Sequence, residues 1–224
     1  MREKYVDSPE KEPDRYLALC DVWREKYLEM DRKELKERFH LDGDERTHYI
    51  TYFNQRYRLD QETGMIMLEE DPERILPFNA VMTIYHLFWY SKPGARVSGR
   101  FVPFREVKRA APFDAAFRRN VLEAAARTFD GHLEELRRAC DALGGRPLPQ
   151  GDAGYQILAF DCMPLQFIFW DGDDEFPAQA NILFDADITD FLHEETVVCV
   201  GDELFRRLGE ESGLREIRRP FGDR

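Results

Sequence analysis

The stretch 155–184, YQILAFDCMPLQFIFWDGDDEFPAQANILF, decides the fold class. It contains two segments rich in aromatic and β-branched residues, Tyr155–Phe160 and Leu165–Trp170, and such segments are typical of strands. A turn at 162–164 separates them. A third segment of the same kind, Ala178–Phe184, follows an acidic turn and can pair with the second. The pattern therefore predicts antiparallel strands in the C-terminal half of the chain.

A second set of strands is expected upstream, where Thr47–Phe53, Arg56–Leu59 and Met65–Leu68 form a predicted three-stranded meander. Apolar residues at helical spacing predict helices from Pro13 to Tyr27, Asp31 to Phe39, Pro72 to Tyr90, Phe113 to Thr128, Leu133 to Leu143 and Phe191 to Leu208. The helix from Pro72 to Tyr90 is expected to be central, with Ile75, Met82, Tyr85 and Trp89 along one face and its aromatic residues in the core.

Helices and strands are segregated along the chain, without a regular β-α-β alternation. The predicted class is therefore α+β, with antiparallel sheet layers packed against several helices. The length of 224 residues fits one domain, expected over residues 13–208. Residues 1–12 and 209–224 are predicted to be flexible tails.

Charge and composition exclude several classes of protein. The chain has 32 Lys plus Arg against 44 Asp plus Glu, a net charge of −12, which repels nucleic acid and anionic lipid. No apolar run approaches the roughly 18 residues of a membrane span, and no secretory signal is apparent. The four cysteines lack the close spacing of a zinc ribbon or an iron–sulfur site. We expect a soluble, cytoplasmic protein with no nucleic-acid or membrane partner.

The segment with the most polar chemistry runs from Trp170 to Pro177 (WDGDDEFP) and is followed by Asn181 and Asp185. Its carboxylates could converge on a divalent cation, the one cofactor that this pattern indicates, with Asp171, Asp173, Asp174 and Asp185 as the candidate ligands. An EF-hand loop is excluded, because Phe176 occupies the position of its Gly and Ile182 that of its Glu. The alternatives are a solvated turn, a site for a polar ligand and catalytic carboxylates.

A second group of polar residues surrounds Phe104-Arg105-Glu106 and includes Lys108, Arg109, Arg118 and Arg119. Arginine binds carboxylate or phosphate through two parallel hydrogen bonds, so these residues could form an anion pocket. The alternative is that Arg105 and Arg118 pair with some of the many acidic residues of the chain.

Three stretches, in this order, resemble the bacterial and archaeal family catalogued as domain of unknown function DUF3786. They are Tyr85-His86-Leu87, Phe104-Arg105-Glu106 with Ala116-Phe117-Arg118-Arg119, and Trp170–Ala178 with Asn181–Asp185; Leu143-Gly144-Gly145 also fits. The resemblance covers residues 14–208. It implies a fold but no reaction, although relatives with an added iron–sulfur segment hint at redox or one-carbon metabolism. The family commonly has Glu-Leu-Pro-Gly-Gly where this chain has Glu106-Val107-Lys108-Arg109-Ala110. That departure puts any function of a glycine-rich turn in doubt.

The sequence leaves three hypotheses and does not decide whether the protein is an enzyme. The first is a non-catalytic protein that binds a small polar ligand, a cation or a protein partner, with a site drawn from Trp170, Asp173, Asp174, Glu175, Asp185, Arg105 and Glu106. The second is a metal-dependent hydrolase that uses the acids of residues 171–187. The third is a structural subunit that docks on a partner through an aromatic surface.

Overall fold

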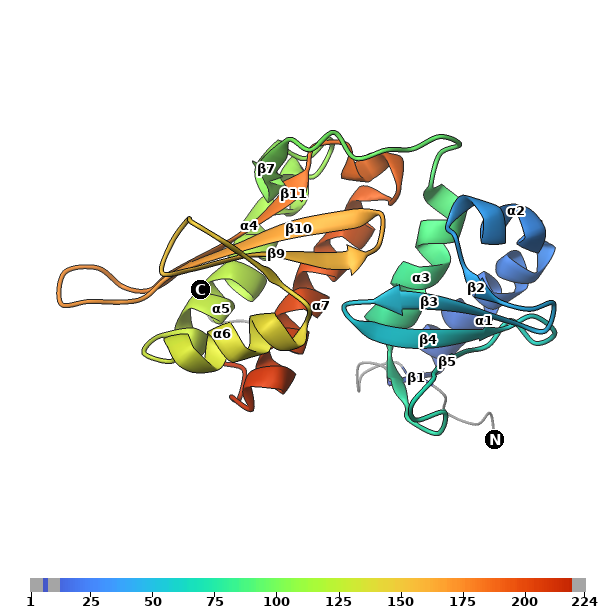
Figure 1. Ribbon diagram of the computed structural model, residues 1–224, viewed down its shortest axis with the longest axis horizontal. Helices are drawn as coiled ribbons and strands as arrows, with labels where there is room; N and C mark the ends of the chain where they lie inside the picture. Colours follow the sequence, from blue (N-terminus) through green and yellow to red (C-terminus); the bar gives the residue numbers. More distant parts are fainter. Residues whose placement is uncertain (1–5, 8–12, 219–224) are drawn as a thin grey trace.

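A computed structural model describes residues 6–7 and 13–218 of the chain (Figure 1). In these residues two antiparallel sheets, of four and five strands, pack against helices, so the predicted α+β class is confirmed. Most of the predicted N-terminal tail and residues 219–224 lie outside the described part of the chain.

The N-terminal half contains two helices, a four-stranded sheet and a third helix. The elements are α1 (Pro13–Glu29), α2 (Arg32–Arg38), β2 (Asp42–Gly43), β3 (Thr47–Tyr52), β4 (Gln55–Asp60), β5 (Ile66–Leu68) and α3 (Phe78–Tyr90). The sheet has the order β2-β3-β4-β5, so the predicted meander is confirmed and gains the short strand β2 at one edge. Residues alternate between buried and partly exposed along β3, as expected for a sheet with one covered face.

Helix α3 begins six residues later than the sequence pattern indicates. Leu76 precedes a proline, which disfavours helical backbone, and Leu76–Pro77 instead forms β6, which pairs in parallel with β1 (Val6–Asp7). Ile75 therefore lies outside the helix and is 47% exposed, and Trp89 is 46% exposed near the helix end. The core position predicted for Trp89 was therefore wrong, whereas Tyr85 is buried as predicted and Met82 is also buried.

The C-terminal half is built on the five-stranded sheet, in the order β7-β11-β10-β9-β8. Its strands are β7 (Phe101–Pro103), β8 (Arg146–Leu148), β9 (Ala153–Phe160), β10 (Met163–Trp170) and β11 (Gln179–Asp185). The hairpin predicted from residues 155–184 forms, with Leu165 opposite Phe184 and Trp170 opposite Gln179.

The helices of this half are α4 (Asp114–Phe117), α5 (Glu123–Phe129), α6 (Leu133–Ala142) and α7 (Glu194–Ser212). A π-helical turn over Arg118–Leu122 separates α4 from α5, where the sequence predicts one continuous helix. Helix α7 runs past residue 208, and beyond it the Ile217 N–H donates to Thr128 Oγ1 at 2.8 Å. Helix α7 therefore continues into the segment that the sequence assigns to the C-terminal tail.

The two halves share one buried hydrophobic cluster, which extends from Leu17 on α1 to Leu208 on α7. At the contact between the sheets, the Tyr52 and Phe160 rings stack with centroids 4.5 Å apart, and Phe53 N–H donates to the Ala159 carbonyl at 2.9 Å. Helix α7 lies against α3 as well as beside the larger sheet (Figure 1). The core thus continues across the seam between the halves.

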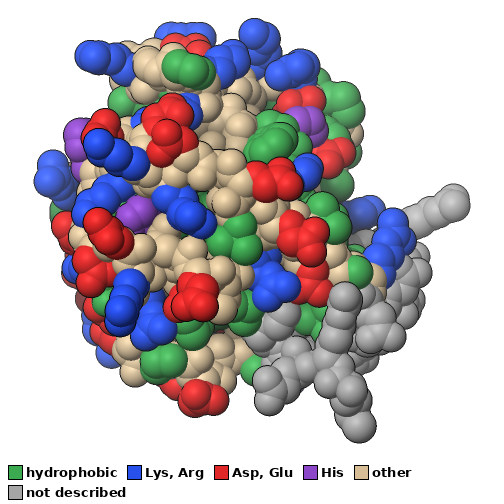
Figure 2. Space-filling model, turned by 90° about the vertical axis from the view of Figure 1, so that its right-hand side faces the viewer, with side chains coloured by type: hydrophobic (Ala, Val, Ile, Leu, Met, Phe, Trp, Pro, Cys, Tyr) green, Lys and Arg blue, Asp and Glu red, His purple; other side chains and the backbone are tan. Residues whose placement is uncertain are grey.

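The face formed by the N-terminal half carries acidic and basic side chains interspersed, with hydrophobic side chains in small separate groups (Figure 2). Several of these charges form ion pairs, including Arg24 with Asp21 at 3.3 Å and Arg56 with Glu69 at 3.2 Å. No helix in the described residues is long and apolar enough to span a membrane.

Candidate functional site

Three buried phenylalanines position the most distinctive group of polar side chains. Phe104 stacks on Phe117 with ring centroids 4.4 Å apart, and both rings pack edge-on against Phe184 of β11. Each ring is no more than 2% exposed. Because Arg105 follows Phe104 and Arg118 follows Phe117, this packing fixes the backbone of both arginines near the same edge of the sheet.

That edge is open because β7 is short. Strand β7 pairs only with residues 183–185 of β11, and after Pro103 the chain turns away into a 3₁₀ turn over Phe104–Glu106. Among the described strands, none pairs with Gln179–Asn181 on that side. Trp170 of β10 lies directly opposite Gln179 of β11. Asn181 follows Gln179 by two residues on β11, so its side chain lies on the same face of the sheet.

These segments enclose a hollow of about 360 Å³, which we call the arginine hollow. It is lined by Pro103, Phe104, Arg105, Asp114, Arg118, Leu122, Trp170, Gln179, Ala180 and Asn181. The structure therefore brings together Arg105 and Trp170, two of the predicted site residues that are far apart in the sequence. Arg118 and Asn181, which belong to the quoted sequence stretches, lie in the same hollow.

The π-helical turn supplies two of the lining residues, Arg118 and Leu122. Such turns are rare and often occur at functional sites, because the extra residue changes the direction of neighbouring side chains. The turn follows Phe117, which packs so closely on Gly201 of α7 that a Cβ there would lie 2.5 Å from Phe117 Cε2. Gly201 thus permits the helix contact that sets the position of Arg118.

The hollow has an excess of positive charge, although the whole chain has a net charge of −12. Asp114 is the one acidic residue in its lining, and its carboxylate is 3.9 Å from the Arg118 guanidinium. Exposed pairs of this kind contribute little, about 0–1 kcal/mol, so Arg118 can readily exchange its partner. Arg105 forms no ion pair within the described residues. Trp170, 42% exposed, offers an aromatic face beside these charges.

The acidic turn lies outside the hollow. Asp173 Oδ1 accepts hydrogen bonds from the Glu175 and Phe176 N–H groups at 2.8 and 2.7 Å, and these bonds lower the pKa of Asp173. Asp171 accepts from the Gly131 N–H at 2.8 Å. Asp174 and Glu175 are exposed. These carboxylates shape the turn or face solvent, which matches the solvated-turn alternative.

Asp185 is buried and hydrogen-bonded within the protein, and it does not face solvent. It is fully buried, and it accepts hydrogen bonds from Ser98 N–H and Oγ–H, from Gly99 N–H and from Asp187 N–H, at 2.7–3.0 Å. Burial alone raises the pKa of Asp185, but these hydrogen bonds outweigh burial and hold the pKa below its usual value. Four donors use the acceptor sites of a carboxylate, so Asp185 anchors the 98–99 loop instead of offering a ligand.

The four candidate metal ligands, Asp171, Asp173, Asp174 and Asp185, are therefore not brought to one point. Within the described residues, no group of three or more His, Cys, Asp or Glu side chains is placed to hold a metal ion. Glu106, also predicted as a site residue, is exposed and does not line the arginine hollow.

Gln179, Asp114 and Leu122 also line the hollow and were not among the predicted site residues. The i,i+4 spacing of Asp114 and Arg118 was the one available signal, and it points to a helical ion pair. Where the resemblance places glycines, Arg109 takes a left-handed φ of 64°. The backbone there has a conformation that favours glycine, although the residue is arginine.

Fold and hollow together define an α+β protein of two antiparallel sheets, with an arginine-lined hollow at the edge of the larger sheet. The chain belongs to the family described as Domain of unknown function (DUF3786), whose model matches residues 31–207. Neither a curated protein nor a solved structure matches the chain.

Proposed function

We propose that this chain is a non-catalytic binding protein whose arginine hollow holds a small anion with a planar body. The observation that carries the proposal is the convergence of Arg105, Arg118 and Trp170 on one hollow. A guanidinium matches the geometry of a carboxylate or phosphate through two parallel hydrogen bonds. The Trp170 indole offers a surface on which a flat ligand can stack.

The remaining polar groups of the hollow support the same ligand class. The amides of Gln179 and Asn181 each provide both donors and an acceptor, which suits a carbonyl or hydroxyl on the ligand body. The buried Phe104–Phe117 stack holds the arginine backbones before any ligand arrives. A site that is already ordered loses less conformational entropy on binding.

Calorimetric titration with phenyl phosphate tests the proposal. Hydrogen bonds to charged groups contribute about 1.5–3 kcal/mol, so Arg105→Gln and Arg118→Gln should each weaken binding by about tenfold or more. Arg146→Gln is the matched control, because Arg146 is exposed on β8 at the opposite edge of the same sheet. Equal affinity of all four proteins, or no binding to the parent chain, contradicts the proposal.

A further inference from the structure

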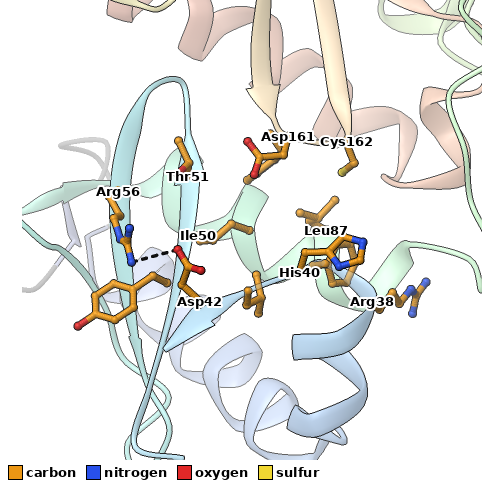
Figure 3. A pocket seen from close by; sticks show the side chains of 13 residues that line it. Arg38, His40, Asp42, Ile50, Thr51, Arg56, Leu87, Asp161 and Cys162 are labelled. Carbon is orange, nitrogen blue, oxygen red and sulfur yellow. Dashed lines mark ion pairs between the residues drawn. The ribbon is translucent and has the colours of Figure 1, made fainter. Parts of the chain in front are cut away.

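A second cavity lies at the seam between the two halves of the molecule (Figure 3). Its volume is about 210 Å³, and its walls come from the end of α2, from β2–β4, from α3 and from the turn between β9 and β10. It shares four lining residues, Arg38, Phe39, His40 and Cys162, with a shallower hollow of about 550 Å³ beside the 92–97 loop. We call the two together the seam cleft.

His40 lines both cavities of the seam cleft and has an unusual backbone conformation. Helix α2 ends in a Schellman motif, in which the Leu41 N–H donates to the Lys36 carbonyl at 3.0 Å. The residue that adopts the left-handed conformation in this motif is usually glycine, but here it is His40, with a φ of 50°. The imidazole projects into the cleft beside Leu87 (Figure 3). A non-glycine residue in this conformation beside a cavity is a candidate for a functional side chain.

Charge is segregated along the seam cleft, apart from Arg56, which lines the acidic side and pairs there with Asp42. Arg38, His40, Lys92 and Arg96 lie toward the 92–97 loop, and the acidic lining residues, Asp42 and Asp161, lie toward β3. Asp42 is neutralised by Arg56 at 3.3 Å, whereas Asp161 forms no ion pair in the part of the chain that the structure describes. Arg38 is held by the Ser91 carbonyl and Lys92 by Asp190, so His40 and Arg96 are the freest groups at the basic end.

The floor between the two ends is apolar. Ile50 lies between Asp42 and Asp161, with Leu87 next to His40 (Figure 3). Cys162 also lines this floor. Burial raises the pKa of its thiol to about 11, so the thiol is uncharged near neutral pH and counts as apolar. The cleft therefore offers an anion-binding end, an apolar middle and a carboxylate end.

We infer that the seam cleft binds a zwitterionic small molecule, with an anionic group at His40 and Arg96, an apolar body over Ile50 and Cys162, and an amino group at Asp161. This ligand class differs from the planar anion of the arginine hollow, because it requires a positive charge on the ligand. Because Asp42 already pairs with Arg56, Asp161 is the acid that recognises the positive charge of the ligand.

Titration of 4-(aminomethyl)benzoate against benzoate tests the inference, since the two probes differ only by the aminomethyl group. The titrations use the Arg105→Gln/Arg118→Gln protein, so that the arginine hollow cannot contribute. We expect 4-(aminomethyl)benzoate to bind at least tenfold more tightly than benzoate, and Asp161→Asn to remove that difference. Equal binding of the two probes, or no binding of either, overturns the inference.

His40→Gly separates a binding role from a folding role. Glycine relieves the left-handed strain, so the melting temperature should stay the same or rise, while both probes should bind at least fivefold more weakly. Unchanged affinity in His40→Gly overturns the role of His40. Asp44→Asn, an exposed acid outside the seam cleft, serves as the control for Asp161→Asn and should leave both affinities unchanged.

Discussion

The Phe104 and Phe117 rings are stacked at a centroid distance of 4.4 Å, and each ring is followed in the chain by an arginine of the same hollow. The buried pair comes from segments that are separated by a loop and a helix start, yet it places Arg105 and Arg118 together. The hydrophobic core therefore determines the charge arrangement of the surface above it.

Gly201→Ala should disturb the arginine hollow from beneath. The new Cβ would lie 2.5 Å from Phe117 Cε2, so the ring must move, and such overpacking typically costs about 1–3 kcal/mol of unfolding free energy. Gly209→Ala, in the same helix, is the control, because its Cβ meets only the flexible Glu216 side chain at 3.1 Å. Urea melts should show a loss for Gly201→Ala alone, with weaker binding of phenyl phosphate. A loss of equal size in both variants contradicts this account.

Asp185→Asn should reduce stability and leave phenyl phosphate binding unchanged. The amide nitrogen of the variant would face an N–H group that donates a hydrogen bond to the carboxylate in the parent chain. A buried donor left without an acceptor costs about 1–3 kcal/mol. Denaturant melts and calorimetry on the same preparation measure both quantities. If binding were lost while stability stayed at the parent value, Asp185 would be a ligand residue, as the sequence predicts.

Arg109→Gly should stabilise the protein. Arg109 has a φ of 64°, a conformation that costs an L residue roughly 1–2 kcal/mol and costs glycine little. The ion pair that the variant loses, Arg109 with Glu194 at 3.6 Å, is exposed on the arginine side and contributes little. Thermal melts should show a higher Tm for Arg109→Gly, and a lower Tm would mean that the side chain makes a larger contribution than its contacts indicate.

Stability should fall with acidification through His86. Its Nδ1 lies 2.7 Å from Thr196 Oγ1, across the contact of α3 with α7. Burial, with smaller contributions from His193 and Lys26, lowers the pKa of His86 to about 4. An unfolded histidine has a pKa of about 6.5, so between these values the unfolded chain binds a proton that the folded chain does not. The free energy of unfolding therefore decreases as the pH falls from about 6.5 to about 4, by at most about 1.4 kcal/mol per pH unit.

His86→Gln isolates this contribution, because glutamine can still hydrogen-bond but does not titrate. In urea melts, the free energy of unfolding of the parent minus that of His86→Gln should decrease from pH 7 to pH 5. A difference that stays constant over that range would show that His86 does not titrate in the way its burial implies.

The longer strands β3, β4, β9, β10 and β11 could be predicted because their aromatic and β-branched residues recur with little interruption, as in Leu165–Trp170. The short strands β2 and β8 were not predicted, because Asp42–Gly43 and Arg146–Leu148 contain residues that favour turns. The π-helical turn at Arg118–Leu122 could not be predicted, since it inserts one residue without changing the apolar pattern around Phe117 and Val121. The start of α3 was also missed, because the pairing of Leu76 with Val6 is a contact between distant parts of the chain.

The candidate site could be predicted in part. Arg105 and Trp170 were identified by residue type, but their meeting depends on where β7 ends, which no local pattern reveals. The role of the acids could not be read from the sequence, because a carboxylate that caps a turn, such as Asp173, has the same sequence pattern as one that binds a ligand. Asp185 illustrates the same difficulty inside the core, where its four donors come largely from a loop 86–87 residues away.

The most direct measurement of the central claim is the tryptophan fluorescence of the parent chain and of Trp170→Phe during titration with phenyl phosphate. Two of the three tryptophans, Trp23 and Trp89, pack on each other in the N-terminal half, so the difference between the two proteins reports on the arginine hollow. We predict a saturable change in fluorescence in the parent and no such change in Trp170→Phe. In Arg105→Gln the affinity obtained from the titration should be at least tenfold lower than in the parent. A parent protein whose Trp170 emission shows no saturable change would contradict the assignment of this hollow as a binding site.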